Sequence, residues 1–116
     1  MLSGINKGNN YGLHVIYSGT VAGAREAAAK GIPAVALSLD SHSSDADYAP
    51  AAAAALPLLR RLLARLSSPG GPADVLKGTV LNVNFPVCTL DRMRGYELTR
   101  QARFAPVTLT LHERAT

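Results

Sequence analysis

The first twenty residues gather groups that bind anions and hard cations. Residues 3–20 read SGINKGNNYGLHVIYSGT and lead directly into an alanine-rich helical pattern. The first turn of a helix has unpaired N–H groups and the positive end of the helix dipole, so Ser18, Gly19 and Thr20 are candidates to hold a phosphate. Asn6 and Asn10 carry amide oxygens that suit a divalent cation, and amide N–H groups that donate to phosphate oxygens.

The same residue types also occur for purely local reasons. Gly and Asn are common in turns, and Ser or Thr caps helices whether or not a ligand is present. The spacing alone therefore leaves two interpretations open, a ligand-binding loop and an ordinary turn.

The elements that follow this loop form the pattern of an α/β unit. We expect a helix that begins at Ser18 or Gly19 and runs through TVAGAREAAAK, with Ser18 as its N-cap and Gly31 as its C-terminal stop. Residues 32–39, IPAVALSL, are an apolar run without alternation, which is typical of a strand covered on both faces in a parallel sheet.

A second helix is expected from about Tyr48 to Leu66, although Pro57 in its interior tends to kink or restart a helix. Residues 67–72, SSPGGP, end it. Its leucines recur at helical spacing and its arginines take the other face. The apolar face consists of Leu56, Leu59, Leu62, Leu63 and Leu66, and the charged face of Arg60, Arg61 and Arg65.

Three further segments have strand-like patterns. Residues 78–86, GTVLNVNFP, alternate β-branched and polar residues and end at Pro86. Two more strands are expected, YELTRQ from Tyr96 and PVTLTLHE from Pro106. The alternation in VTLTLH indicates a hairpin or arm with one exposed face.

The order of these segments resembles one known family. SGINKGNNYG, followed by VIYSGTVAGAREAAAKGIPAVALSLD, is similar to the long signature of the SurE family, the survival-protein 5′-nucleotidases and acid phosphatases. That signature has an SGxNxGxN loop, a YSGTVxxAxE helix start and a GxPAxAxS segment. LNVNFP and GYELTRQ are weaker matches to the family's LNxNxP and GxxxTRQ segments, and the latter wording together with His14 is similar to plant members.

This resemblance implies a Rossmann-like, three-layer αβα fold and a divalent-metal-dependent phosphomonoester hydrolase. Asn6 matches a metal ligand and, with Ser18 and Thr20, a catalytic position. Asn10, Ser18, Gly19 and Thr20 match positions around the bound phosphate. The implied cofactor is Mg²⁺ or Mn²⁺, which would polarise the phosphate and help generate the attacking hydroxide. The implied substrate is a nucleoside monophosphate or another phosphomonoester, and the implied assembly of the complete protein is a homo-oligomer.

One part of the family pattern is missing from this sequence. The family's metal site also uses an Asp pair in an NDDG stretch and a serine, both of which precede the SGxN loop. We therefore expect residues 1–116 to be a partial domain that lacks the N-terminal metal-binding segment, with an exposed sheet edge, a shortened C-terminal arm and little or no activity. The alternative is a non-catalytic phosphate-binding or interaction protein derived from this family. A generic nucleotide-binding domain ranks lowest, because no GxGxxG or P-loop is present.

The loop LDSHSSDAD offers a second group of polar residues. Asp40, His42, Asp45 and Asp47 lie close together, but they lack the glycine and distal glutamate of a calcium loop. We interpret the acidic residues as capping the following helix.

Four isolated residues have side chains that could take part in chemistry. His14 is a candidate proton donor, but packing within the loop is the favoured interpretation. Lys7 is as readily a solvated loop residue as a charge that steers phosphate. Cys88 has no evident His partner and is interpreted as a small apolar residue, and His112 receives no role.

The length and composition of the chain limit the number of domains and the classes of partner that can be expected. A chain of 116 residues with 47% hydrophobic residues fits one globular domain, and its net charge of +4 favours anionic partners in general. Aromatic residues do not interleave with the basic ones, so no nucleic-acid polymer is expected. No apolar run is long enough for a membrane span and no secretory signal is evident, so we expect a cytoplasmic protein.

Overall fold

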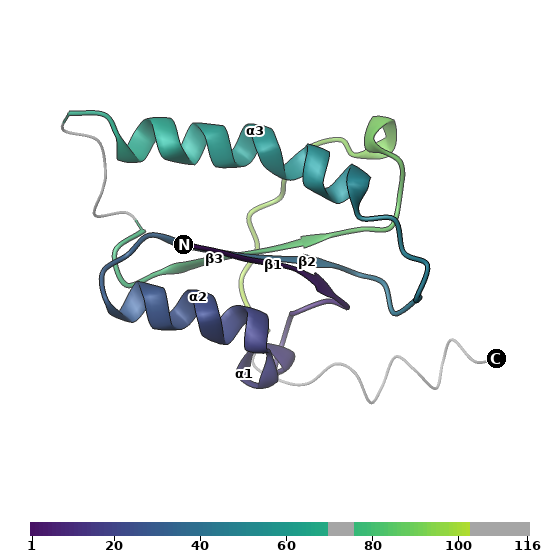
Figure 1. The fold of residues 1–116 in the computed structure, drawn as a ribbon, viewed down its shortest axis with the longest axis horizontal. Coiled ribbons are helices and arrows are strands. Elements are labelled where there is room, and N and C mark those ends of the chain that lie inside the picture. The colour runs from purple at the N-terminus through teal and green to yellow at the C-terminus, as the bar shows by residue number, and fades with distance from the viewer. Residues whose placement is uncertain (70–75, 103–116) are drawn as a thin grey trace.

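Three parallel strands form the centre of the molecule, with helices on both faces (Figure 1). The computed structural model describes residues 1–69 and 76–102. The sheet has the strand order β1-β2-β3, in which β1 is Leu2–Lys7, β2 is Ala34–Leu39 and β3 is Val80–Phe85. One face is covered by α1 (His14–Tyr17) and α2 (Gly19–Ala29), and the other by α3 (Ala49–Leu66). The predicted three-layer α/β fold is confirmed.

The central strand β2 is buried along its whole length, as its uninterrupted apolar sequence predicts. Its side chains alternate between two cores. The core on the α2 face contains Val21, Ala24, Ala28, Ala34 and Ala36. The core on the α3 face contains Val35, Leu37, Leu39, Ala51, Ala55 and Phe85. Because the period of a strand is two, even-numbered residues of β2 and β3 face α2 and odd-numbered residues face α3.

The predicted first helix is confirmed as α2. Ser18 is its N-cap, and the Ser18 hydroxyl accepts a hydrogen bond from the Val21 amide at 3.1 Å. The chain leaves α2 through Gly31, whose φ of 76° lies in the left-handed region that favours glycine. This capping fixes the position of the Ser18–Thr20 turn at the edge of the sheet.

Helix α3 confirms the second predicted helix, which runs through Pro57 as one element. The leucine face expected from its sequence is wrong in part. Ala51 and Ala55 are the residues buried against the sheet, whereas Leu56 and Leu63 are 52% and 62% exposed. Small alanine side chains let the helix backbone lie close to the sheet, and this rotates part of the leucine stripe towards solvent.

Two expectations about local structure are wrong. Residues 3–20 do not form one loop, because Leu2–Lys7 is a strand and His14–Tyr17 is a short helix. Gly4 interrupts the strand pattern in the sequence, yet a Cβ at this position would collide with the backbone carbonyl of Leu37 in the neighbouring strand. The segment from Tyr96 forms no strand over its described residues.

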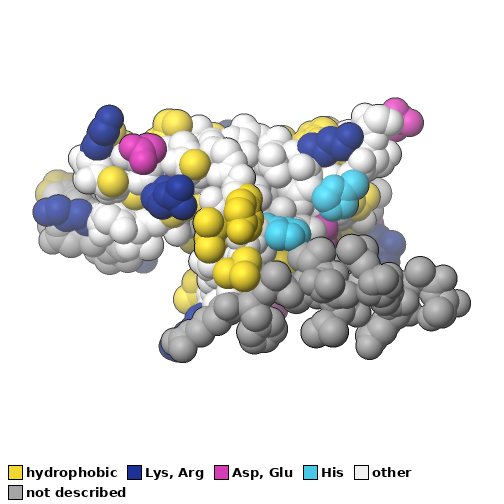
Figure 2. Space-filling view, turned by 90° about the horizontal axis from the view of Figure 1, so that it is seen from below, with side chains coloured by type: hydrophobic (Ala, Val, Ile, Leu, Met, Phe, Trp, Pro, Cys, Tyr) yellow, Lys and Arg dark blue, Asp and Glu magenta, His cyan; other side chains and the backbone are white. Residues whose placement is uncertain are grey.

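The outer strands of the sheet and the charges on the surface were also compared with the sequence expectations. Among the described residues, β1 and β3 each have a strand neighbour on one side only, as expected for an exposed edge. The predicted arm from Pro106, and His112 within it, lie outside the described residues. None of the described helices is both long and apolar enough to cross a bilayer. On the face drawn in Figure 2, Lys and Arg side chains are dispersed and form no continuous patch.

Candidate phosphate site

A row of polar residues crosses the sheet near the carboxyl ends of its strands. In the strand register Asn6 pairs with Ser38, and Ser38 pairs with Asn84. These residues lie on the α2 face, one step beyond the position of Ala36 in the apolar core of that face. The carboxyl ends of parallel strands are where open α/β sheets bind ligands. The polar row therefore marks the candidate site.

Asn6 connects the end of β1 to the first turn of α2. Its Oδ1 accepts a hydrogen bond from the Thr20 hydroxyl at 3.2 Å. Its Nδ2 donates to the backbone carbonyls of Lys7 and Gly8, both at 2.9 Å. The structure thus brings two predicted site residues, fourteen positions apart, into direct contact. With its amide hydrogens committed to the backbone, Asn6 presents its oxygen towards the helix turn.

The Ser18–Thr20 turn retains donors for an anion. The Ser18 hydroxyl is used by the Val21 amide, but the amides of Gly19 and Thr20 are in the first helical turn, where no intrahelical acceptor exists. A Cβ added at Gly19 would meet no atom within 4 Å, so there is open space beside this amide. Together with the dipole of α2, these groups suit a phosphoryl group.

Asn10 is a buried anchor of the loop that follows β1, with a relative exposure of 4%. Its side-chain Nδ2 donates to the Ser38 hydroxyl at 2.7 Å. Its backbone N–H donates to Asn84 Oδ1 at 2.7 Å, and its carbonyl accepts from Asn82 Nδ2 at 2.6 Å and from Asn84 Nδ2 at 3.2 Å. Asn10 therefore fixes the loop to β2 and β3, and its contact with phosphate stays a prediction.

Three of these anchors were not singled out from the sequence. Ser38, Asn82 and Asn84 received no role there, although LNVNFP was noted as a family-like segment. The signal that could have found them is the two-residue spacing of Asn82 and Asn84, which places both amides on one face of a strand. Their contact with Asn10, more than seventy positions away, is visible only in three dimensions.

The acidic loop after β2 has a structural role. Asp40 Oδ1 accepts a hydrogen bond from Asn9 Nδ2 at 2.6 Å, and Asp47 Oδ1 accepts from the Ala49 amide at 2.9 Å at the start of α3. The second contact agrees with the capping interpretation. The His42 ring packs against Gly8, since a Cβ built there would lie 3.0 Å from its Cε1.

The His14 ring stacks beside Tyr11, with ring centroids 6.5 Å apart and an interplanar angle of 17°. This contact is the packing that the sequence favoured over a proton-donor role. Cys88 is half-buried with a free thiol, and Lys7 is exposed at the end of β1.

The described residues do not by themselves form a site for a divalent metal. Over residues 1–69 and 76–102, no group of three or more His, Cys, Asp or Glu side chains converges. Asn6 Oδ1 is a suitable hard ligand, but it is neutral and already accepts the Thr20 hydroxyl. Because Mg²⁺ and Ca²⁺ sites rely on carboxylates, Asn6 alone does not fit such an ion.

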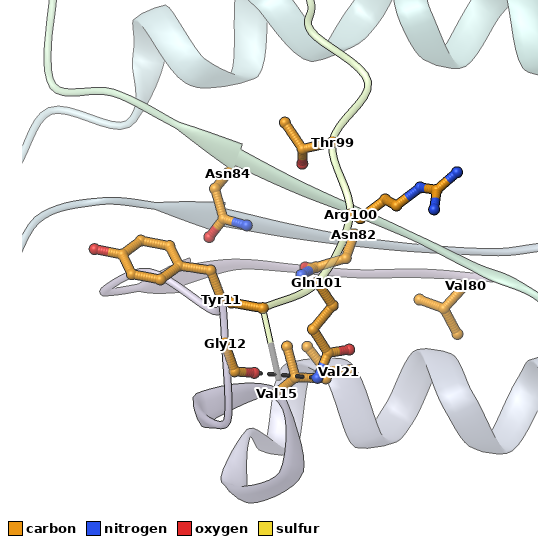
Figure 3. A pocket seen from close by; sticks show the side chains of 11 residues that line it. Tyr11, Gly12, Val15, Val21, Val80, Asn82, Asn84, Thr99, Arg100 and Gln101 are labelled. Carbon is orange, nitrogen blue, oxygen red and sulfur yellow. Dashed lines mark hydrogen bonds between the residues drawn. The ribbon is translucent and has the colours of Figure 1, made fainter. Parts of the chain in front are cut away.

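A cavity of about 340 Å³ lies beside the polar row (Figure 3). It adjoins Asn82 and Asn84 of β3 and Val21 of α2, and residues 99–102 form part of its wall. Its lining does not include Asn6 or the Ser18–Thr20 turn. The cavity is thus a neighbour of the phosphate turn and is separate from it.

Comparisons with known proteins identify the family of this chain. The family model described as survival protein SurE matches residues 1–106. A protein of Rhodopseudomonas palustris (strain TIE-1) named 5′-nucleotidase SurE is 39% identical over 118 residues, which cover 98% of this chain and 43% of that protein. A protein of the same name from Syntrophobacter fumaroxidans is 42% identical over 107 residues, covering 92% of this chain and 39% of the relative.

The fold is also found in a solved structure. The crystal structure of the SurE protein from Aquifex aeolicus superposes with a TM-score of 0.72 at 34% identity, covering 88% of this chain and 38% of that one. This chain thus spans about two fifths of the length of the relatives it matches. On the family model, the identities and the shared fold, the chain belongs to the SurE survival-protein family.

Proposed function

We propose that this chain binds the phosphoryl group of phosphomonoesters, nucleoside 5′-monophosphates among them, at the first turn of α2. The observation that carries the proposal is the hydrogen bond from the Thr20 hydroxyl to Asn6 Oδ1, which joins that turn to the end of β1. The names of the curated relatives, 5′-nucleotidase, support a nucleotide substrate.

The proposed roles follow from the chemistry of each group. The amides of Gly19 and Thr20 donate to phosphoryl oxygens, and the dipole of α2 favours their negative charge. Asn6 orients the Thr20 hydroxyl, and Ser18 keeps the helix start in shape by capping Val21. Asn10 holds the loop beside the turn.

Hydrolysis requires more than these groups, and we propose that it depends on Mg²⁺ or Mn²⁺ held by carboxylates that the described residues do not supply. As the domain assignment, we propose that residues 1–116 contribute the phosphate-binding half of a nucleotidase site. On this proposal the chain by itself turns over little or no substrate. A homo-oligomeric state, which the family resemblance implies, and a cytoplasmic location, which was expected from the sequence pattern, remain predictions.

The second candidate function is phosphate binding without catalysis. It is favoured by a different observation, which is that no acidic cluster converges among the described residues. A polar turn at a helix start binds anions without any metal. The two candidates differ in one measurable property, which is turnover of a phosphomonoester in the presence of Mn²⁺.

The binding proposal is tested by NMR titration of the ¹⁵N-labelled chain with inorganic phosphate and with AMP. Saturable shifts of the Gly19 and Thr20 amides are expected with both compounds. A titration in which these two amides do not respond at millimolar phosphate contradicts the proposal. Turnover of a generic phosphomonoester with Mn²⁺ then separates the candidates, and robust, chelator-sensitive activity lost in Asn6→Ala contradicts the expected inactivity.

A further inference from the structure

One side of α3 carries exposed leucines. Leu56 and Leu63 are 52% and 62% exposed, and they are seven residues apart, so both lie on the same side of the helix. Ala51 and Ala55 are buried against the sheet. At about 100° per residue, the leucines lie roughly 110° round the helix from these alanines. They therefore point sideways over the sheet and not straight out to solvent.

The opposite side of α3 is covered by the segment that follows β3. The Tyr96 hydroxyl donates to the Ala54 carbonyl, and residues 99–102 share the lining of one cavity with residues of β3. Figure 1 shows this segment crossing from the α3 face of the sheet to the α2 face. Ala54 is rotated by roughly 200° from Leu56 and roughly 180° from Leu63. The two leucines thus lie on the side of α3 that is above β1.

Strand β1 is open beneath these leucines. In the strand register Leu2 pairs with Val35, which faces α3, so Leu2 lies on the α3 face. Lys7 lies on the same face through its partner Leu39. Leu2 is 50% exposed and Lys7 is exposed, whereas both partners in β2 are buried. Because a helix is about 10 Å wide and strands are about 4.8 Å apart, one helix covers about two strands and α3 leaves β1 uncovered.

The charges of the two elements that form this surface are all positive. Neither β1 nor α3 contains an Asp or Glu residue. Lys7 ends β1, and the exposed Arg60 is rotated by roughly 50° from the leucines towards solvent. The β1–α3 surface, as we define it, consists of Leu2, Lys7, Leu56, Arg60 and Leu63. It has apolar residues at its centre and basic residues at its rim, so it fits a partner with an apolar centre and carboxylates at its edges.

The shape of the β1–α3 surface favours a helix as that partner. Helices on one face of a sheet lie side by side with axes about 8–10 Å apart, and the spacing of Leu56 and Leu63 is the heptad repeat that packs against a second helix. A bilayer would contact the outermost side of α3, from which the leucines turn away. A second copy in a two-fold interface would set Lys7 and Arg60 against the same positive charges.

We propose that the β1–α3 surface binds an amphipathic helix with acidic flanks that another polypeptide contributes. The apolar face of that helix packs on Leu2, Leu56 and Leu63, and its carboxylates meet Lys7 and Arg60. The proposal is independent of the phosphate turn, which lies on the α2 face of the sheet.

The probe is a synthetic peptide of 18 residues, the length of α3, with leucines at heptad spacing and glutamates on both sides of them. A matched peptide has lysine in place of every glutamate. In an NMR titration of the ¹⁵N-labelled chain, the glutamate peptide is expected to shift amides of β1 and α3 and to bind about tenfold more tightly than the lysine peptide. Equal affinity of the two peptides, shifts confined to other elements, or no response at millimolar peptide overturns the proposal.

Variants of exposed residues locate the contact. Arg60→Glu is expected to abolish the preference for the glutamate peptide. Arg61→Glu is the matched control, because Arg61 is equally a charged, exposed residue but lies roughly 100° further from the leucines. Leu63→Gln should weaken binding at least tenfold, whereas Ile32→Gln, at a 47% exposed position away from this surface, should not. Equal effects within either pair contradict docking at the β1–α3 surface.

Two further measurements test the other occupants. The chain alone is expected neither to dimerise through this surface in sedimentation nor to bind vesicles of phosphatidylglycerol. A dimer that dissociates in Leu63→Gln overturns the proposal, because copies of the chain then occupy the surface. Vesicle binding that is lost in the same variant overturns it as well, because lipid then takes the place of the helix.

Discussion

The side-chain amide of Asn84 binds both polar groups of one peptide residue, Asn10. Its Oδ1 accepts the Asn10 N–H at 2.7 Å, and its Nδ2 donates to the Asn10 carbonyl at 3.2 Å. An extended strand would offer a neighbour the same pair of groups, so Asn84 continues the sheet hydrogen bonding into a loop. This contact holds the segment between β1 and α1 over the carboxyl ends of β2 and β3.

Replacing Asn84 by Leu should destabilise the chain and loosen this loop. The change keeps a similar volume but leaves the N–H of Asn10 without its acceptor, so we expect a loss of about 2 kcal/mol in the free energy of unfolding. Urea unfolding monitored by circular dichroism measures it. Asn9→Leu is the control, because the side-chain bond of Asn9 within the described residues is an exposed one to Asp40, and its effect should stay below about 0.5 kcal/mol. Equal effects of the two changes contradict the anchoring role.

Thr20→Val tests the link between the helix turn and β1. Valine has the shape of threonine without the hydroxyl, so the bond to Asn6 Oδ1 is lost while α2 keeps its cap. We expect phosphate to bind about fivefold more weakly, from the loss of roughly 1 kcal/mol of hydrogen bonding. Isothermal titration with phosphate measures the change. Thr20→Ser keeps the hydroxyl and should bind nearly as the parent chain does, and a matching loss there contradicts the hydroxyl's role.

The parts of the fold that sequence predicted are those set by local pattern. The apolar run at residues 32–39 predicted the buried strand, which the structure places at Ala34–Leu39, and Ser18 with the alanines predicted α2. The strand at Leu2–Lys7 was missed because Gly4 and Asn6 look like loop residues. Gly4 is there because the carbonyl of the adjacent strand leaves no room for a Cβ, a tertiary constraint that a local pattern does not reveal.

The residues of the candidate site also fall into two groups, those that the sequence identified and those that only the structure shows. Asn6 and Thr20 were identified together from a resemblance in residue order, and the structure brings them into contact. Their functional roles rest on that resemblance and on the proposal above. The sequence around Asn82 does not predict its contact with Asn10. That contact depends on the strand register and on the loop folded over the strand. Contacts between segments this far apart are set by tertiary packing and need coordinates.

Ser18 offers a way to separate helix capping from anion binding. Ser18→Ala removes the acceptor for the Val21 amide and should cost about 1 kcal/mol of stability. Ser18→Asp restores a good cap, so its stability should be close to that of the parent chain, yet its charge lies beside the phosphate turn and should weaken phosphate binding at least tenfold. Thermal unfolding and phosphate titration give the two readouts. If Ser18→Asp binds phosphate normally, the anion does not bind at this turn.

Tyr96 predicts how stability changes in alkali. Its hydroxyl donates to the Ala54 carbonyl in α3, and desolvation raises the pKa of the Tyr96 phenol above its usual value of 10.0. A raised pKa means that folding favours the neutral phenol, so this stabilisation is intact below about pH 10 and is lost as the pH rises through the folded-state pKa. The free energy of unfolding should therefore decline as the pH rises above about 10. Tyr96→Phe should decline less steeply than the parent chain, and identical alkaline slopes contradict this assignment.

Asn6 determines what the described residues can do with a metal. Its neutral oxygen is a single hard ligand, so we expect the parent chain to bind Mn²⁺ no better than millimolar and to be unaffected in stability by a chelator. Asn6→Asp adds a carboxylate at the same position and keeps an acceptor for the Thr20 hydroxyl, but it loses the two Nδ2 hydrogen bonds to the carbonyls of Lys7 and Gly8. The added charge should tighten Mn²⁺ binding about tenfold. Paramagnetic broadening of the Thr20 amide resonance during a Mn²⁺ titration measures the Mn²⁺ affinity of both chains. Micromolar Mn²⁺ binding by the parent chain that disappears in Asn6→Ala would show that a complete metal site is already present.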